Sequence, residues 1–158
     1  MNPVVIIPTF ASARGRVEAG AVTTTYDHAT SMAAPGELPR CLESLRIVRG
    51  LGQIVVLVVA EPAIENKAAS KIRGIAEQFP DLDIAVVGAP EMQLVRQRME
   101  QLNIGLRGEV GLAGYGAVRN LGLILANALD FDSVVFIDDD VVVDDPAFLE
   151  KAMYGLGK

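Results

Sequence analysis

Residues 133–143, SVVFIDDDVVV, bring an unbroken apolar run directly against three consecutive carboxylates, Asp138, Asp139 and Asp140. β-Branched and aromatic residues favour a buried strand, whereas three adjacent like charges are costly away from water unless they hold a cation. The stretch therefore predicts a strand over residues 133–138 with the charges at its carboxyl end. Such oxygen ligands suit a divalent ion of the Mg²⁺ or Mn²⁺ type; the alternative is that all three are solvated loop residues.

Three further segments repeat the apolar, β-branched pattern and are also expected to be strands. They are residues 4–7 (VVII), 53–61 (QIVVLVVAE) and 83–89 (DIAVVGA). The runs are apolar on both faces rather than alternating, which is typical of a parallel sheet covered by helices on both sides. We expect the first of these strands to end at Pro8.

Helical periodicity fills the intervals between these strands. Apolar residues recur every three or four positions within residues 38–48, 64–79, 92–102 and 118–129. Gly50 and Pro80 are expected to end the first two helices. Asp145 and Pro146 predict the N-cap and first turn of a short last helix. Alternating strands and helices predict an α/β domain.

Length and composition narrow the class of protein. The 158 residues fit one domain, and the apolar runs are far shorter than the ~20 residues that span a bilayer. A net charge of −6 argues against a nucleic-acid partner. The single cysteine, Cys41, is expected to be a buried apolar side chain, and no signal peptide is recognised at the N-terminus. We expect a cytoplasmic protein with no transmembrane segment.

Two segments interrupt the alternation of strands and helices. Residues 11–37 are rich in Ala, Gly, Ser and Thr, contain the only histidine, His28, and are too long for an ordinary connection. They are interpreted as an irregular insertion, either a mobile lid or a disordered segment. Residues 104–115 contain four glycines and are interpreted as a flexible connection.

Ligands of open parallel sheets bind outside the carboxyl ends of the strands. The residues that end the expected strands are therefore the main site candidates. They are Pro8, Thr9, Phe10, Glu61, Asp138, Asp139 and Asp140.

The order and spacing of five segments resemble the family 2 glycosyltransferases of GT-A fold. The segments are IIPTF (6–10), LPRCLESL (38–45), the second strand with VVLVV (55–59), GLAGYGAVRNLGLILANAL (111–129) and FIDDDVVVDDPAFLEK (136–151). The resemblance implies a Rossmann-like, three-layer α/β/α sandwich with a mostly parallel sheet. It also implies metal-dependent transfer of a sugar from a UDP-type or GDP-type nucleotide-diphosphate sugar to an acceptor that the sequence does not identify.

The resemblance implies roles for the acidic residues. Asp140 matches the direct ligand of Mn²⁺ or Mg²⁺, and Asp138 matches a contact to the ribose or to the metal shell. Asp139 matches either role.

Four more residues match positions near the donor. Pro8 and Thr9 match contacts to the base and ribose, and Arg119 and Asn120 match the helix segment beside the donor. For Arg119 the alternative is an exposed helix arginine, and for Asn120 it is a bond to the backbone.

The chain departs from the family pattern at two places. Glu61-Pro62 replaces the acidic turn that usually follows the second strand, so Glu61 is the candidate base contact. Only eighteen residues follow Asp140, so we expect the donor-binding half without the acceptor half. The catalytic base is left unassigned, and His28 is a candidate only if its segment folds over the site.

Two other functions stay open. A nucleotidyltransferase on a related fold would need a basic, glycine-rich loop after the first strand, for which residues 13–16 (ARGR) are the only nearby candidate. A non-catalytic nucleotide-binding or assembly protein is the second alternative. The oligomeric state is also open, with a homo-oligomer among the alternatives.

Overall fold

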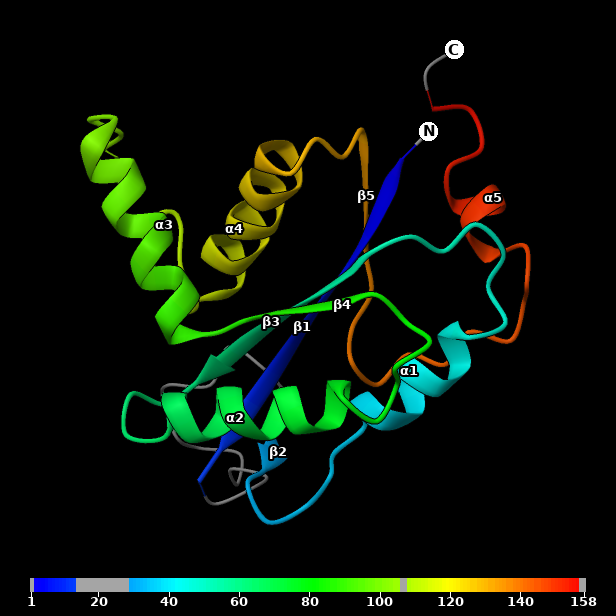
Figure 1. The fold of residues 1–158 in the computed structure, drawn as a ribbon, viewed down its shortest axis with the longest axis horizontal. Helices are drawn as coiled ribbons and strands as arrows, with labels where there is room; N and C mark the ends of the chain where they lie inside the picture. Colours follow the sequence, from blue (N-terminus) through cyan, green and yellow to red (C-terminus); the bar gives the residue numbers. More distant parts are fainter. Residues whose placement is uncertain (1, 14–28, 106–107, 157–158) are drawn as a thin grey trace.

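The computed structural model of the chain describes residues 2–13, 29–105 and 108–156. A five-stranded parallel sheet is flanked by helices (Figure 1). The strands are β1 (Pro3–Ser12), β2 (Thr30–Ser31), β3 (Ile54–Ala60), β4 (Ile84–Val87) and β5 (Ser133–Phe136). The helices are α1 (Leu38–Leu45), α2 (Glu65–Ala76), α3 (Ala89–Gln101), α4 (Tyr115–Ala128) and α5 (Phe148–Ala152).

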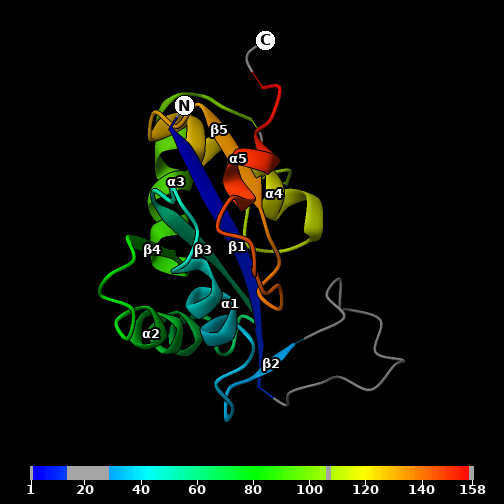
Figure 2. The same cartoon turned by 90° about the vertical axis from the view of Figure 1, so that its right-hand side faces the viewer.

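The order of the strands reverses direction at β1. One side of β1 pairs with β3, which in turn pairs with β4, and the other side pairs with β5, so that Ile6 lies opposite Phe136. The short β2 pairs with the last two residues of β1. Figure 2 shows β5 beside the upper half of β1 and β2 at its lower end. The β1–β5 boundary is therefore the point at which a ligand crevice is expected in an open α/β sheet.

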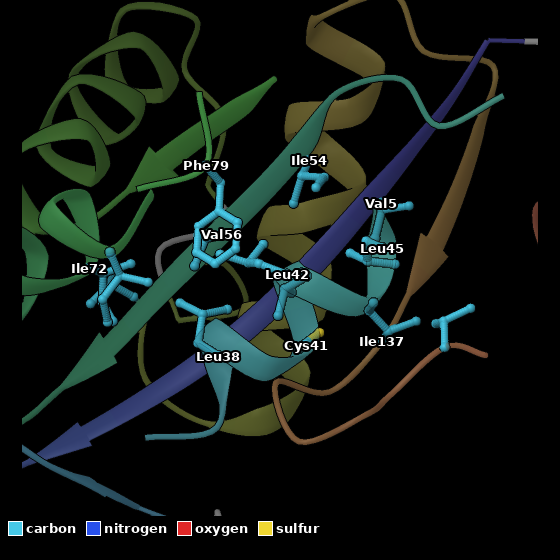
Figure 3. Close-up of a cluster of buried hydrophobic side chains, with 14 of the residues drawn as sticks. Val5, Leu38, Cys41, Leu42, Leu45, Ile54, Val56, Ile72, Phe79 and Ile137 are labelled. Carbon is cyan, nitrogen blue, oxygen red and sulfur yellow. The ribbon is translucent and has the colours of Figure 1, made fainter. Parts of the chain in front are cut away.

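Two apolar layers cover the two faces of the sheet. On one face α1, α2 and α5 pack against alternate residues of β1, including Val5 and Ile7. Figure 3 shows Leu38, Leu42 and Leu45 of α1 lying against the strands in this layer. On the other face α3 and α4 cover the intervening residues of β1, such as Val4 and Ile6. The predicted α/β class, with a parallel sheet that is apolar on both faces, is confirmed.

The predicted end of the first strand at Pro8 is wrong, because β1 continues to Ser12. The Val5 N–H points toward the β3 side and donates to the carbonyl of Gln53, the residue before β3, over 3.1 Å, and the Ile6 carbonyl accepts from Ile137 on the other side. Even-numbered residues of β1 therefore turn their backbone groups away from β3. Pairing with β5 ends at Ile6 and pairing with β2 begins at Ala11. The missing N–H of Pro8 faces this interval, so the proline removes no ladder bond.

Other boundaries also differ from the prediction. The strand β2 was not expected, and β5 ends at Phe136, before the acidic residues. The last helix begins at Phe148, so Asp145 is not its N-cap. Instead the Asp145 carboxylate accepts the Ala147 N–H over 2.9 Å and so closes the turn before the helix.

The remaining helices agree with the sequence pattern. The four expected apolar stripes correspond to α1, α2, α3 and α4, although Leu102 and Leu129 lie just beyond helix ends and are exposed. The expected helix ends at Gly50 and Pro80 are wrong, because α1 ends at Leu45 and α2 at Ala76. Beyond both ends the chain continues in turns, in which Val48 donates to the Leu45 carbonyl and Phe79 to the Ala76 carbonyl, each over 3.0 Å. Cys41 is fully buried, as predicted. Within the described ranges, the helices are all too short or too polar to traverse a lipid bilayer.

A close approach of α4 to the sheet depends on Gly122. A methyl group added at this position would lie 2.8 Å from the Phe136 ring and 3.1 Å from Ile6. The glycine therefore sets how closely α4 packs against β5 and β1, next to the acidic segment.

We predict that Gly122→Ala destabilises the fold by about 1–3 kcal/mol, because the added methyl group overpacks this interface. Gly116→Ala in the same helix is the matched control, since a methyl group there meets nothing within 4 Å. Urea unfolding of both variants measures the difference. A Gly122→Ala variant as stable as the Gly116→Ala control would contradict the packing role.

Candidate functional site

A pocket of about 480 Å³ lies where the first turn of α1 and the β2 segment meet the acidic turn after β5. Its described lining residues come from these three places. They are Ala29, Thr30, Ser31, Ala34, Gly36, Glu37, Arg40, Asp139 and Asp140. Pockets of this volume accommodate ligands of nucleotide size.

Hydrogen bonds fix the path of the backbone after β5. The Ile137 N–H donates to the Ile6 carbonyl, and the Val141 N–H closes a turn onto the Asp138 carbonyl, each over 3.1 Å. The Val143 N–H donates to the Ser44 hydroxyl on α1 over 3.0 Å. These bonds anchor both ends of the acidic turn to the sheet and to α1.

Asp139 is the least solvated of the three carboxylates. The hydroxyl of Thr9, which is only 2% exposed, donates to its Oδ2 over 2.5 Å. Burial raises the pKa of the Asp139 carboxyl to about 6; the Thr9 hydrogen bond opposes the rise, while the charges of Asp140 and Asp138 add to it. The surroundings of Asp139 therefore do not fully offset the cost of burying its negative charge.

The thiol of Cys41 lies beneath this acidic turn. Its sulfur is 3.9 Å from the Asp138 carbonyl oxygen. Burial, together with the charges of Asp139 and Asp140, raises the pKa of Cys41 to about 12. The thiol is therefore protonated at neutral pH and has the packing role expected from the sequence.

Asp138 faces a different helix from its two neighbours. Its carboxylate, 65% exposed, accepts from the Arg119 guanidinium over 3.1 Å. The guanidinium carbon of Arg119 lies 4.8 Å from the centre of the Tyr115 ring and 4.7 Å from that of Phe136. The arginine is thus not the fully exposed helix residue of the alternative interpretation, since only 23% of its side chain is accessible.

The remaining predicted site residues lie outside the described lining of this pocket. Pro8 is buried in β1. Glu61 is exposed at the end of β3 and accepts from Ser12 over 3.3 Å. Asn120 donates to the Glu109 carbonyl over 2.9 Å, which ties the glycine-rich connection to α4 and matches the backbone-bonding alternative.

A divalent ion fits the chemistry of the pocket carboxylates. No cluster of three or more acidic, histidine or cysteine side chains suited to a metal occurs among residues 2–13, 29–105 and 108–156. However, an ion that shares its shell with phosphate and water needs only one or two protein carboxylates. Asp139 and Asp140 supply two, and a cation beside Asp139 would offset the burial that disfavours its charge. Asp138, bonded to Arg119, does not line the pocket with Asp140.

One wall of the pocket was not foreseen from the sequence. It is formed by the β2 segment, which Lys71 of α2 holds by donating to the Ser31 carbonyl over 2.7 Å and to the Ala34 carbonyl. Gly36 ends this wall with φ +75°, and a methyl group there would lie 2.5 Å from Thr30. The Pro35-Gly36 pair was the one local signal of this turn.

The other sequence hypotheses concern residues outside the described ranges. His28 and most of the basic loop over residues 13–16 fall within residues 14–28, which the structure does not describe. The hypotheses of a catalytic histidine and of a triphosphate-binding loop therefore stay predictions.

Comparisons with known proteins yield no match for this chain among family models, curated proteins or solved structures. The motifs and the geometry of the pocket are therefore the features that bear on function.

We predict that Asp139→Asn becomes more stable relative to the wild type as pH rises. The pKa of this carboxyl is about 6 in the folded protein and ordinarily 3.8. Protonation of Asp139 therefore contributes stability to the wild type that is fully present below pH 3.8 and is lost as the pH rises through 6. In buffer with EDTA, the stability difference should shift by on the order of 1 kcal/mol between pH 4 and pH 8.

The exposed Asp144→Asn is the control, because it removes the same charge from the same loop. Urea unfolding across the pH range measures both variants. A stability difference for Asp139→Asn that stays constant with pH would refute the effect of burial on this carboxyl.

Proposed function

We propose that the chain is the donor-binding domain of a metal-dependent glycosyltransferase of GT-A fold. It binds a UDP-type or GDP-type sugar at the carboxyl edge of β1 and β5, for transfer of the sugar to an acceptor. The observation that carries the proposal is the pocket at the point where the strand order reverses, lined by Asp139 and Asp140. The family motifs quoted above supply the reaction class.

In this proposal Asp139 and Asp140 hold Mn²⁺ or Mg²⁺. When bound, the ion neutralises the negative charge that develops on the departing diphosphate. Thr9 orients Asp139 through its hydroxyl, which makes it a positioning residue rather than a direct contact to the base or ribose.

Asp138 and Arg119 form a second, separate unit of the proposed site. The guanidinium fixes one oxygen of Asp138, and the exposed carboxylate keeps further lone pairs for a ribose hydroxyl. Cation–π contacts of Arg119 with the Tyr115 ring and with the Phe136 ring hold the arginine, and therefore the Asp138 carboxylate, in place. Arg119 also keeps a fixed positive charge beside Asp138.

We predict that wild-type protein binds UDP or GDP in the presence of Mn²⁺ and that Asp140→Ala loses this binding by at least about 10–100-fold, because a carboxylate ligand of the ion is removed. Calorimetry with and without Mn²⁺ measures the affinity. Asp144→Ala, which removes an exposed carboxylate four residues away, should bind as the wild type does.

Three outcomes would contradict the proposal. Unchanged Mn²⁺-dependent affinity in Asp140→Ala would remove the acidic turn from the site. Release of pyrophosphate from a nucleoside triphosphate and a sugar phosphate would favour the nucleotidyltransferase. Failure of the wild type to bind either nucleotide with Mn²⁺ would leave the non-catalytic assembly role.

A further inference from the structure

The pocket carries opposite charges on its two sides. Asp139 and Asp140 enter from the turn after β5, whereas Arg40 enters from the first turn of α1. A ligand that contacts both sides must present a cationic group to the carboxylates and an anionic group to the guanidinium. A diphosphate with its bound ion has this arrangement of charges.

Arg40 is available for such a contact. Its side chain is 67% exposed, and its ion pair within the described part of the chain is with Glu37, at 3.7 Å. This separation is well beyond the 2.7–2.9 Å that is usual for a charge-assisted hydrogen bond. The guanidinium donors are thus not committed to a strong partner there.

The position of Arg40 does not favour the stability of α1. A cation in the first turn of a helix faces the positive end of the helix dipole, and the first turn of α1 has no acidic residue. The side chain of Glu37, at the N-cap, makes no capping hydrogen bond. An anion in the pocket would offset this unfavourable placement of charge.

The charges of the lining also make anion binding conditional on a cation. Without an ion, Asp139, Asp140 and Glu37 outnumber the single positive charge of Arg40 among the described lining residues. A free phosphate would then be repelled. A divalent ion on the carboxylates would reverse the local sign and let a phosphate reach the guanidinium, whose planar fork matches phosphate oxygens.

We infer that Arg40 is the phosphate-binding residue of this pocket, so that the donor diphosphate lies between the ion on Asp139 and Asp140 and the guanidinium on α1. The inference rests on the proposed function and adds to it a specific contact and an orientation of the ligand. The nucleoside then extends beyond the diphosphate and does not contact Arg40. Arg40 therefore contributes to affinity only for ligands that carry phosphate.

The test is a calorimetric series of nucleoside, monophosphate and diphosphate (uridine and guanosine forms), in Mn²⁺, on the wild type and Arg40→Gln. We expect Arg40→Gln to weaken diphosphate binding about tenfold or more and to leave nucleoside binding unchanged. Arg49→Gln is the matched control, because Arg49 is 62% exposed and has a similar long ion pair with Glu150, at 3.6 Å. It should bind the whole series as the wild type does.

The outcomes separate this inference from the proposed function. If the wild type binds the diphosphate with Mn²⁺ but Arg40→Gln binds it equally well, the role of Arg40 is refuted and the proposed function stands. Equal weakening for nucleoside and diphosphate also refutes a phosphate contact. If the wild type itself binds no nucleotide, the proposed function fails and the inference fails with it. Thermal unfolding confirms that each variant is folded.

Discussion

The central position of β1 is the constraint on which the rest of the structure depends. Its long pairing with β3 and its shorter pairing with β5 bury one strand on both edges and both faces. Because β5 stops at Phe136 while β1 continues to Ser12, the chain after β5 leaves the sheet alongside the second half of β1. The acidic turn is thereby brought to Thr9.

The electrostatics of the turn follow from this geometry. Three adjacent carboxylates repel one another, and the structure lowers that repulsion by sending Asp138 to Arg119 and Asp139 to Thr9. Asp140 remains exposed at the pocket. The division leaves one carboxylate paired with a cation, one partly buried and one solvated, so the three residues are not chemically equivalent despite their identity.

Apolar patterns in the sequence predicted the helices and strands whose formation depends on residues close together in the chain. The four helices and the β3, β4 and β5 strands follow from apolar periodicity, because each segment buries a stripe or a run that is visible in the sequence. The strand β2 could not be predicted, since two residues have no pattern and owe their conformation to β1. The path of β1 through Pro8 depends on where its neighbours end. The Lys71 contact with the β2 segment joins residues forty positions apart, and no local signal indicates it.

The candidate site shows the same limit. Sequence placed the three aspartates at a strand end, but their separate directions depend on the turn and on α1 and α4. Arg40 was within a quoted motif, yet only the fold brings it opposite Asp139 and Asp140. Asp139 and Asp140 line the pocket, whereas Pro8, Glu61 and Asn120 are not among its described lining residues, so the roles that the family resemblance implies for these three stay predictions.

Pro8 also affects the notch in the sheet, which is the stretch of the β1 edge between the end of its pairing with β5 at Ile6 and the start of its pairing with β2 at Ala11. An open stretch of strand edge ordinarily invites insertion of a foreign strand, and such insertion is a route to aggregation. An intruding backbone at this notch would find a carbonyl but no donor at Pro8. The imino acid at Pro8 thus removes one hydrogen-bond donor from this part of the β1 edge, and the acidic turn after β5 lies alongside the edge at Thr9.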